Sequence, residues 1–352
     1  MARLKTYPDL FTHRRRSVLP EDAQRVIHNL GDGTGSISGD AQKIEAYRAA
    51  LSKLDPNIVA QASVEIREIG GLYHHHRPRK LTLVPAGSPG FRSCTSGWFL
   101  QFHGNGFERE IALRRLEDTP RSPFEFVAIV YRMNDWAVQV RSAAFEYAER
   151  HFPKTDPAII GEAAFFLFEQ MRLLARWEPR ATSLVEDTLY QERVLSLIKD
   201  RLLHITEGPV VRVLRAAMQR PDLDPLLPKL ALEAKSAAIR ACAADILLNG
   251  RARWAGGYKR VWIDKVYGIS RREPDLRQRP LTISVDEQVH MVAASKDKSA
   301  QVRRIAASVL TEQLDNPQHW HSEIAARLKD DRNPSVASRM EFYFRKLTTA
   351  GA

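Results

Sequence analysis

Cysteine is scarce in this sequence, and long apolar runs are absent from it. The chain contains two cysteines, Cys94 and Cys242, which lie far apart. Such a pair provides neither a disulfide framework nor a cysteine-based metal site, so we expect a reducing, cytoplasmic location. No run of about 18 uncharged apolar residues occurs, and charged residues interrupt even the most apolar segment, 158–177. With no secretory signal visible at Met1, we expect no membrane partner.

Motifs of enzyme catalysis are also absent. The sequence has no glycine-rich phosphate loop, no nucleophile elbow, no HExxH motif and no paired CxxC motif. Three consecutive histidines, at 74–76, cannot all face one ion in regular structure, and no further ligand pair lies nearby at a suitable spacing. We therefore expect a non-enzymatic protein with no cofactor and no bound metal.

Positive charge, in contrast, is abundant. The net charge of +11 favours an anionic partner, which is either nucleic acid or an acidic protein surface. Charge alone does not distinguish these two partners. Some of it lies in residues 1–40, which contain three consecutive arginines at 14–16 and end in the glycine-rich sequence GDGTGSISGD. We expect this stretch to be a basic N-terminal segment followed by a flexible linker.

One sequence block recurs along the chain. It consists of a short polar turn, a Val-Arg or Ile-Arg pair and then alanines at helical spacing, and it is clearest as NDWAVQVRSAAFEY at 134–147. Apolar positions 137, 140, 144 and 147 form one stripe of this helix and positions 136, 140 and 143 form a second, so the helix must bury two sides. Further copies, of decreasing clarity, occur at 297–310, 234–247, 207–218, 105–116 and 332–343.

This combination of turn, Val/Ile-Arg pair and alanine-rich helix resembles the HEAT-repeat (armadillo-like) family. The resemblance implies an all-α fold, a right-handed α-solenoid of roughly seven or eight helix pairs. It also implies that an aspartate in the turn and an arginine in the second helix tie adjacent units together. The residues at these places are Asp135, Arg141, Asp297 and Arg303, with Arg212 and Arg240 at the arginine position of blocks that lack the aspartate.

The spacing of the blocks predicts the domain organisation. Block arginines 109 and 141 are 32 residues apart, whereas arginines 240 and 303 are 63 apart. The second interval therefore holds one additional unit of chain, and it coincides with 250–283, where the alanine-rich pattern disappears. We predict an N-terminal segment at 1–40, a HEAT-like solenoid at 41–249 with a long loop at 71–92, a basic aromatic insertion at 250–283, and C-terminal HEAT-like repeats at 284–352.

The insertion at 250–283 is the most suggestive segment for function. It contains nine lysines and arginines against three acidic residues, interleaved with two tryptophans and two tyrosines. Cations neutralise phosphates and aromatic faces stack on bases, so this mixture suits nucleic acid. The candidate contacts are Arg251, Arg253, Trp254, Tyr258, Lys259, Arg260, Lys265, Arg271, Arg272, Arg277 and Arg279, together with Arg77, Arg79 and Lys80 of the 71–92 loop. Alternatively, Tyr258, Val261, Trp262 and Tyr267 form a small satellite core that docks the insertion.

Three functions follow from these patterns. A solenoid offers a long curved surface, so the first expectation is a non-enzymatic adaptor that binds a macromolecule, most often a protein within a larger complex. The second is a DNA- or RNA-binding protein that uses the insertion and the concave face. The third rests on a resemblance in repeat type and basicity to a family of HEAT-like bacterial DNA glycosylases. It implies a carboxylate in an aromatic-lined cleft, where Asp135 with Trp136 or Asp264 with Trp262 would serve, although neither pair matches a catalytic pattern.

Overall fold

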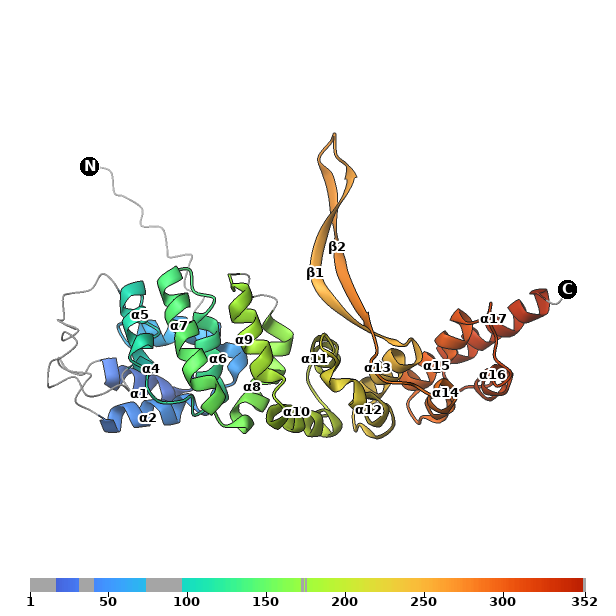
Figure 1. Ribbon diagram of the computed structural model, residues 1–352, viewed down its shortest axis with the longest axis horizontal. Coiled ribbons are helices and arrows are strands. Elements are labelled where there is room, and N and C mark those ends of the chain that lie inside the picture. Colours follow the sequence, from blue (N-terminus) through green and yellow to red (C-terminus); the bar gives the residue numbers. More distant parts are fainter. Residues whose placement is uncertain (1–16, 32–40, 74–96, 172–173, 175, 351–352) are drawn as a thin grey trace, which may run out of the picture. The chain divides into compact units, whose positions relative to one another are not determined.

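The computed structural model describes residues 17–31, 41–73, 97–171, 174 and 176–350. Within these ranges the chain forms seventeen α-helices and one antiparallel pair of strands (Figure 1). The prediction of a mainly helical protein is confirmed, and the segment 251–280, for which no structure was predicted, is a β-ribbon. No helix in these ranges is both long and apolar enough to cross a bilayer.

The described residues divide into two compact units. Unit 1 comprises residues up to Thr155 together with Arg176–Ala181, and unit 2 comprises Asp156–Ala175 and the chain from Thr182 onwards. The elements of unit 1 are α1 (Glu21–Gly31), α2 (Ala41–Leu51), η2 (Pro56–Ile58), α3 (Val59–Ile69), α4 (Gly97–Leu100), α5 (Gly106–Arg114), α6 (Pro123–Arg132), α7 (Val138–His151) and η4 (Phe152–Lys154). One helix, α9 (Pro179–Leu189), begins in unit 1 and continues in unit 2.

Unit 2 contains the remaining helices and both strands. Its elements are α8 (Pro157–Gln170), α10 (Glu192–His204), α11 (Val210–Ala217), η6 (Pro221–Leu226), α12 (Leu227–Glu233), α13 (Ala237–Leu248), β1 (Arg251–Asp264), β2 (Ile269–Pro280), α14 (Glu287–Lys296), α15 (Ala300–Glu312), α16 (His321–Lys329) and α17 (Pro334–Ala350).

Local sequence determines where several of these helices begin. Ser122 accepts a hydrogen bond from the backbone N–H of Glu125 at the start of α6, and Pro123 occupies the first helical position. Asp156 and Pro157 start α8 in the same way. A side-chain acceptor at this point satisfies a backbone N–H that has no partner inside the helix, and proline lacks an N–H there.

A dense aromatic core and buried ionic clusters around Arg48 and Asp135 hold unit 1 together. The ring of Trp98 meets that of Tyr147 edge-on, with centroids 6.0 Å apart. Arg48 is buried beside Trp98 and donates to both carboxylate oxygens of Glu125, each at 2.7 Å, and it is also paired with Asp118. Because every charge in this cluster has an opposite partner, its burial is tolerated.

The helices of unit 2 contact one another in a regular order. α12 packs on α13, α14 on α15 and α16 on α17. The first helix of each pair also contacts the first helix of the next, so that α12 meets α14 and α14 meets α16. The second helices do the same, since α13 meets α15 and α15 meets α17. From α12 to α17, unit 2 is therefore built from three helix pairs, each of which contacts its neighbouring pair.

A β-ribbon interrupts the chain between α13 and α14 without interrupting this contact order. β1 and β2 pair in antiparallel register from Arg251 opposite Pro280 to Asp264 opposite Ile269. Gly250, with a φ of 64°, turns the chain out of α13, and its carbonyl accepts from the backbone N–H of Leu281 at 3.1 Å. At the base the ribbon contacts α11 and α13, and Figure 1 shows its two strands running on beyond those helices.

Candidate nucleic-acid interface

The pairing register of the ribbon assigns its side chains to two faces. Side chains alternate between faces along a strand, and directly opposed residues share a face. The register shifts at Gly256, a bulge that precedes Gly257 with its φ of 129°. A bulge inserts one extra residue into the strand. The odd-numbered residues of β1 before the bulge therefore lie on the same face as the even-numbered residues after it. As a result, Arg251 and Arg253 lie on the same face as Tyr258.

We call the face that collects unpaired cations the basic face. Its charged and aromatic residues are Arg251, Arg253, Tyr258, Arg260, Trp262 and Arg272, and it carries no carboxylate. In the described part of the chain, the guanidinium groups of Arg251, Arg253 and Arg272 have no ion-pair or hydrogen-bond partner. The Arg260 guanidinium lies 5.4 Å from the centroid of the Trp262 ring. This face therefore presents four positive charges to solvent and two aromatic rings beside them.

The opposite face, here called the paired face, holds both acidic residues of β2. Glu273 pairs with Arg271 at 2.5 Å, and Asp275 pairs with Arg277 at 3.1 Å. Lys259 lies directly opposite Glu273 in the register. Trp254 also belongs to this face and is half-buried, so it is less available for stacking than its position in the sequence suggested. Both faces of the ribbon therefore carry cations, but the carboxylates are confined to the paired face.

The aromatic residues of the ribbon do not form a satellite core. Tyr258 is 75% exposed, Tyr267 is 80% exposed and Trp262 is 44% exposed. Rings buried against one another would be largely shielded from water, so docking through these residues is the wrong explanation for them. Lys265 is likewise exposed, in the turn at the end of the ribbon.

Arg279 anchors the base of the ribbon and is not an available nucleic-acid contact, which corrects the sequence-based assignment. It donates to both carboxylate oxygens of Asp224, at 2.6 and 2.8 Å, and to the backbone carbonyls of Met218, Arg220 and Pro280. All five of its N–H donors are thus used within the protein. Although burial of Asp224 opposes ionisation, the hydrogen bonds from Arg279 and Thr282 lower the pKa of this carboxyl group.

The other predicted basic contacts cannot be placed. Arg77, Arg79 and Lys80, together with the histidines at 74–76 and the arginines at 14–16, fall outside the described residues. Among the residues that are described, no group of three or more His, Cys, Asp or Glu side chains could hold a metal ion.

The arginines and aspartates of the repeated block form a ladder, but with different partners from those that the local spacing suggested. Arg109 donates to both carboxylate oxygens of Asp135, at 2.9 and 2.8 Å. Arg240 does the same to Asp297, at 2.8 and 3.0 Å, and Arg303 to Asp331, at 2.5 and 3.0 Å. Each of these three arginines therefore bonds the turn aspartate of the following block, and Arg303 does not bond the carboxylate of Asp297, six residues before it.

Arginines of the repeated block also donate to backbone carbonyls of their own turn. Arg303 donates to the carbonyl oxygen of Asp297, and Arg141 donates to those of Asp135 and Trp136. This arrangement explains how Arg240 takes part although its own turn has no aspartate, because the acceptor comes from Asp297 of the next block. Two block arginines depart from this pattern: Arg141 has no carboxylate partner among the described residues, and Arg212 is exposed and pairs with Glu169 of α8.

Neither carboxylate proposed for glycosylase chemistry is free. Asp135 is buried and accepts from Arg109, from Arg132 at 3.0 Å and from the backbone N–H of Ala137 at 3.0 Å. Asp264 accepts from two backbone N–H groups of the ribbon turn. A general base needs an oxygen within reach of the substrate proton; both oxygens of Asp135 are used within the fold, whereas Asp264 is engaged through its Oδ1.

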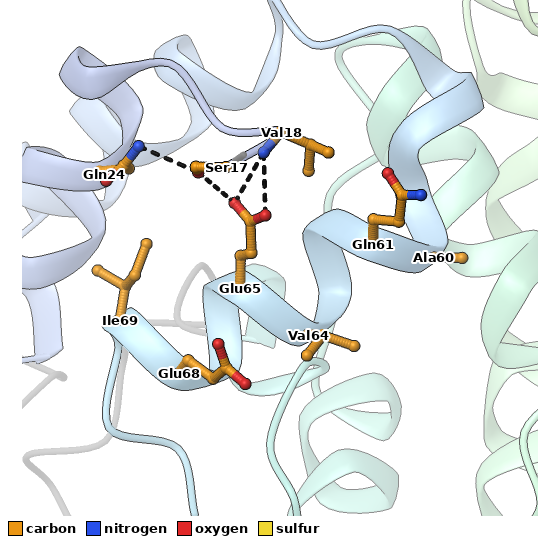
Figure 2. Close-up of a pocket in the computed structure, with 9 residues that line it drawn as sticks. All are labelled: Ser17, Val18, Gln24, Ala60, Gln61, Val64, Glu65, Glu68 and Ile69. Carbon is orange, nitrogen blue, oxygen red and sulfur yellow. Dashed lines mark hydrogen bonds between the residues drawn. The ribbon is translucent and has the colours of Figure 1, made fainter. Parts of the chain in front are cut away.

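Unit 1 also contains a pocket of about 800 Å³, shown in Figure 2, which does not suit an anionic ligand. Its lining includes two carboxylates, those of Glu65 and Glu68, and no lysine or arginine. Glu65 accepts from the backbone N–H groups of Val18 and Leu19 and from the hydroxyl of Ser17, at 2.9, 3.1 and 2.6 Å. The main polar group of this pocket therefore positions the chain that enters α1.

The basic face was not visible in the sequence as a face. Which residues of β1 lie on this face depends on the bulge. In the sequence, the adjacent glycines Gly256 and Gly257 were the feature that could have indicated this bulge. Four exposed apolar residues at the end of the ribbon, Ile263, Val266, Ile269 and Tyr267, were also not recognised as a group.

Compared with known proteins, the chain matches no family model and no curated protein.

Proposed function

We propose that this protein binds nucleic acid, preferentially duplex DNA, through the basic face of its β-ribbon. The observation that supports this proposal is the separation of charge on the ribbon, with Arg251, Arg253, Arg260 and Arg272 on one face and the carboxylates Glu273 and Asp275 on the other. A protein surface would offer hydrogen-bond donors as well as acceptors to such a face, whereas a phosphate backbone offers acceptors and negative charge alone.

The dimensions of the ribbon also support duplex DNA. From Arg251 to Trp262 the basic face extends about 35 Å at roughly 3.3 Å per residue. One turn of B-form DNA has nearly the same length, about 34–36 Å. The major groove of B-DNA, about 12 Å wide, admits a two-stranded β-ribbon, while the major groove of duplex RNA is too narrow for side chains to read.

In this proposal the helices form the scaffold that carries the ribbon. The order in which α12 to α17 contact one another and the arginine–aspartate ladder are consistent with a right-handed, HEAT-like α-solenoid, and a cytoplasmic location is included in the proposal. The role is non-enzymatic binding. Glycosylase activity is the least supported alternative because the carboxylates of Asp135 and Asp264 are already engaged.

A pair of charge-matched variants tests the proposal. One variant replaces Arg251, Arg260 and Arg272 of the basic face with alanine, and its control replaces three cations of the paired face: Lys259, Arg271 and Arg277. Both lose three positive charges. The log–log salt dependence should flatten by about 2.7 in the basic-face variant, at roughly 0.9 for each phosphate contact, and clearly less in the control. Equal losses in the two variants would show that net charge, not the face, determines binding.

Protein binding is a second candidate function, favoured by one separate observation. Phe107, Trp136 and Val138 are exposed at the start of α5 and α7, two helices that contact each other. Exposed aromatic side chains are common anchors of protein interfaces. A protein partner should be retained after nuclease digestion and lost from a Phe107→Ser/Trp136→Ser variant. Loss of every partner on nuclease digestion would remove this candidate.

A further inference from the structure

The end of the ribbon is apolar, although the turn of an isolated hairpin is ordinarily polar. Ile263, Val266, Tyr267 and Ile269 are all exposed, and Val266 is the most exposed of them at 89%. We call these four residues the tip. Each buried methylene group contributes about 0.8 kcal/mol, so side chains of this size are normally withdrawn from water. Here none of them packs on the helices of unit 2, because the ribbon contacts those helices at its base.

The backbone holds the tip in one conformation. The carboxylate of Asp264 accepts from the backbone N–H of Val266 at 2.8 Å and from that of Tyr267 at 3.1 Å. Gly268, with a φ of 68°, supplies the left-handed residue that closes the turn. The register shifts again beside Ile263, and such a bulge redirects the side chains near it. The turn that carries these apolar side chains is thus already ordered before a ligand binds, so binding loses little conformational entropy there.

The tip continues directly into the basic face. Trp262 of that face precedes Ile263 of the tip, and Arg260 lies beside the Trp262 ring. Lys265 lies within the turn itself and is exposed. Any ligand that meets the arginines of the ribbon along its length therefore meets apolar side chains at its end, with a lysine next to them.

We propose that the tip is an apolar wedge that enters between base pairs of the duplex bound by the basic face and partly unstacks them. This inference rests on the proposed function. Proteins that distort DNA commonly insert apolar side chains at a base step, and pyrimidine–purine steps such as TA unstack most easily. Lys265 would meet the phosphates that flank the opened step, and the aromatic ring of Tyr267 would replace part of the lost stacking.

A lipid surface is the principal alternative for an apolar tip with cations nearby, and the length of the basic face argues against it. A bilayer touched by the tip would attract only charges within about a Debye length, roughly 8–10 Å. Arg251 and Arg253 lie some 30 Å or more back along the ribbon, at about 3.3 Å per residue. At that distance these arginines can contact phosphates along a duplex, whereas their attraction to the headgroups of a flat membrane would be screened.

The test uses the full chain and a duplex that carries 2-aminopurine at a TA step, whose fluorescence rises when the base unstacks. The wild-type protein should raise the fluorescence on binding. A Val266→Ser/Tyr267→Ser variant should lose this rise and about tenfold in affinity while its salt dependence stays the same, because no phosphate contact is removed. The matched control is Leu276→Ser, which removes an exposed apolar side chain from the same ribbon outside the tip and should keep the rise.

The possible failures are distinguishable. If the wild-type protein binds the duplex with the expected salt dependence but leaves the fluorescence unchanged, or if the tip variant keeps the full rise, the wedge is refuted and the proposed function stands. If the protein does not bind the duplex at all, both proposals fall. Binding to vesicles containing phosphatidylserine, abolished in the tip variant, would then identify a lipid surface as the ligand. Unchanged melting temperatures are expected for all variants, since the replaced side chains are exposed.

Discussion

Replacing Arg240 with alanine should loosen the packing of α13 against α15 more than any single change to a surface ion pair of unit 2. Arg240 is 7% exposed, and it donates to both oxygens of Asp297 and to the carbonyls of Ala234 and Lys235. Breaking a buried ion pair costs about 3–5 kcal/mol. Asp297 would keep the hydrogen bond from the N–H of Ser299, so we expect the lower end, about 3 kcal/mol.

Hydrogen exchange measured on peptides from α13 and α15 gives this free energy locally. A loss of about 3 kcal/mol corresponds to roughly a hundredfold faster exchange, since each 1.4 kcal/mol is a factor of ten. Arg215→Ala is the control, because the side chain of Arg215 is 41% exposed and its ion pair with Asp245 rests on one contact of 3.3 Å, which predicts a loss of about 1 kcal/mol. Equal effects of the two changes, or no coupling between Arg240→Ala and Asp297→Ala in a double-mutant cycle, would refute the ladder.

Three further predictions concern unit 2. Arg279→Ala leaves the buried carboxylate of Asp224 without its cation, so protection from hydrogen exchange at the ribbon base should fall sharply, whereas Arg277→Ala should leave it unchanged. The hydrogen bonds from Arg303 lower the pKa of Asp331, so the stability from this pair is complete above the unfolded pKa of about 3.9 and is lost as pH falls below it. Urea midpoints at pH 7 and pH 3 measure that loss, which should shrink in Asp331→Asn. Joining residues 251 and 280 through a Gly-Gly turn, with Asp224→Asn added because Arg279 is removed, should preserve the helical circular dichroism spectrum, since Arg240 still reaches Asp297; a largely unfolded product would contradict this.

Much of the helical part could be predicted because its signal is local. The block at 134–147 indicated a helix that begins after a polar turn, and α7 begins at Val138. The pairing of the arginines was less accessible. Arg303 and Asp297 are six residues apart, which suggests one interaction, whereas the geometry splits it into a backbone contact to Asp297 and an ion pair with Asp331. That division depends on how successive helix pairs pack, which no single block encodes.

The ribbon escaped prediction for a physical reason. A strand is recognised by alternation of apolar and polar residues when one of its faces is buried. Beyond its base this ribbon has no buried face, so no apolar alternation is required, and Ala252 is the one fully buried side chain of β1. Composition did indicate the cations and aromatic rings. Their separation onto one face depends on the bulge at Gly256 and therefore on the pairing register.

The central claim is that the ribbon is the nucleic-acid contact, and one titration tests it most directly. Binding of a fluorescent duplex of about 20 base pairs is measured by anisotropy from 50 to 200 mM salt, for the wild-type protein and for an Asp224→Asn protein in which a Gly-Gly turn joins residues 251 and 280. Three of the four basic-face arginines, Arg253, Arg260 and Arg272, lie between the joined residues, so the log–log slope of the wild-type protein should be steeper than that of the shortened protein by up to about 2.7. The same affinity and slope for both proteins would contradict the account.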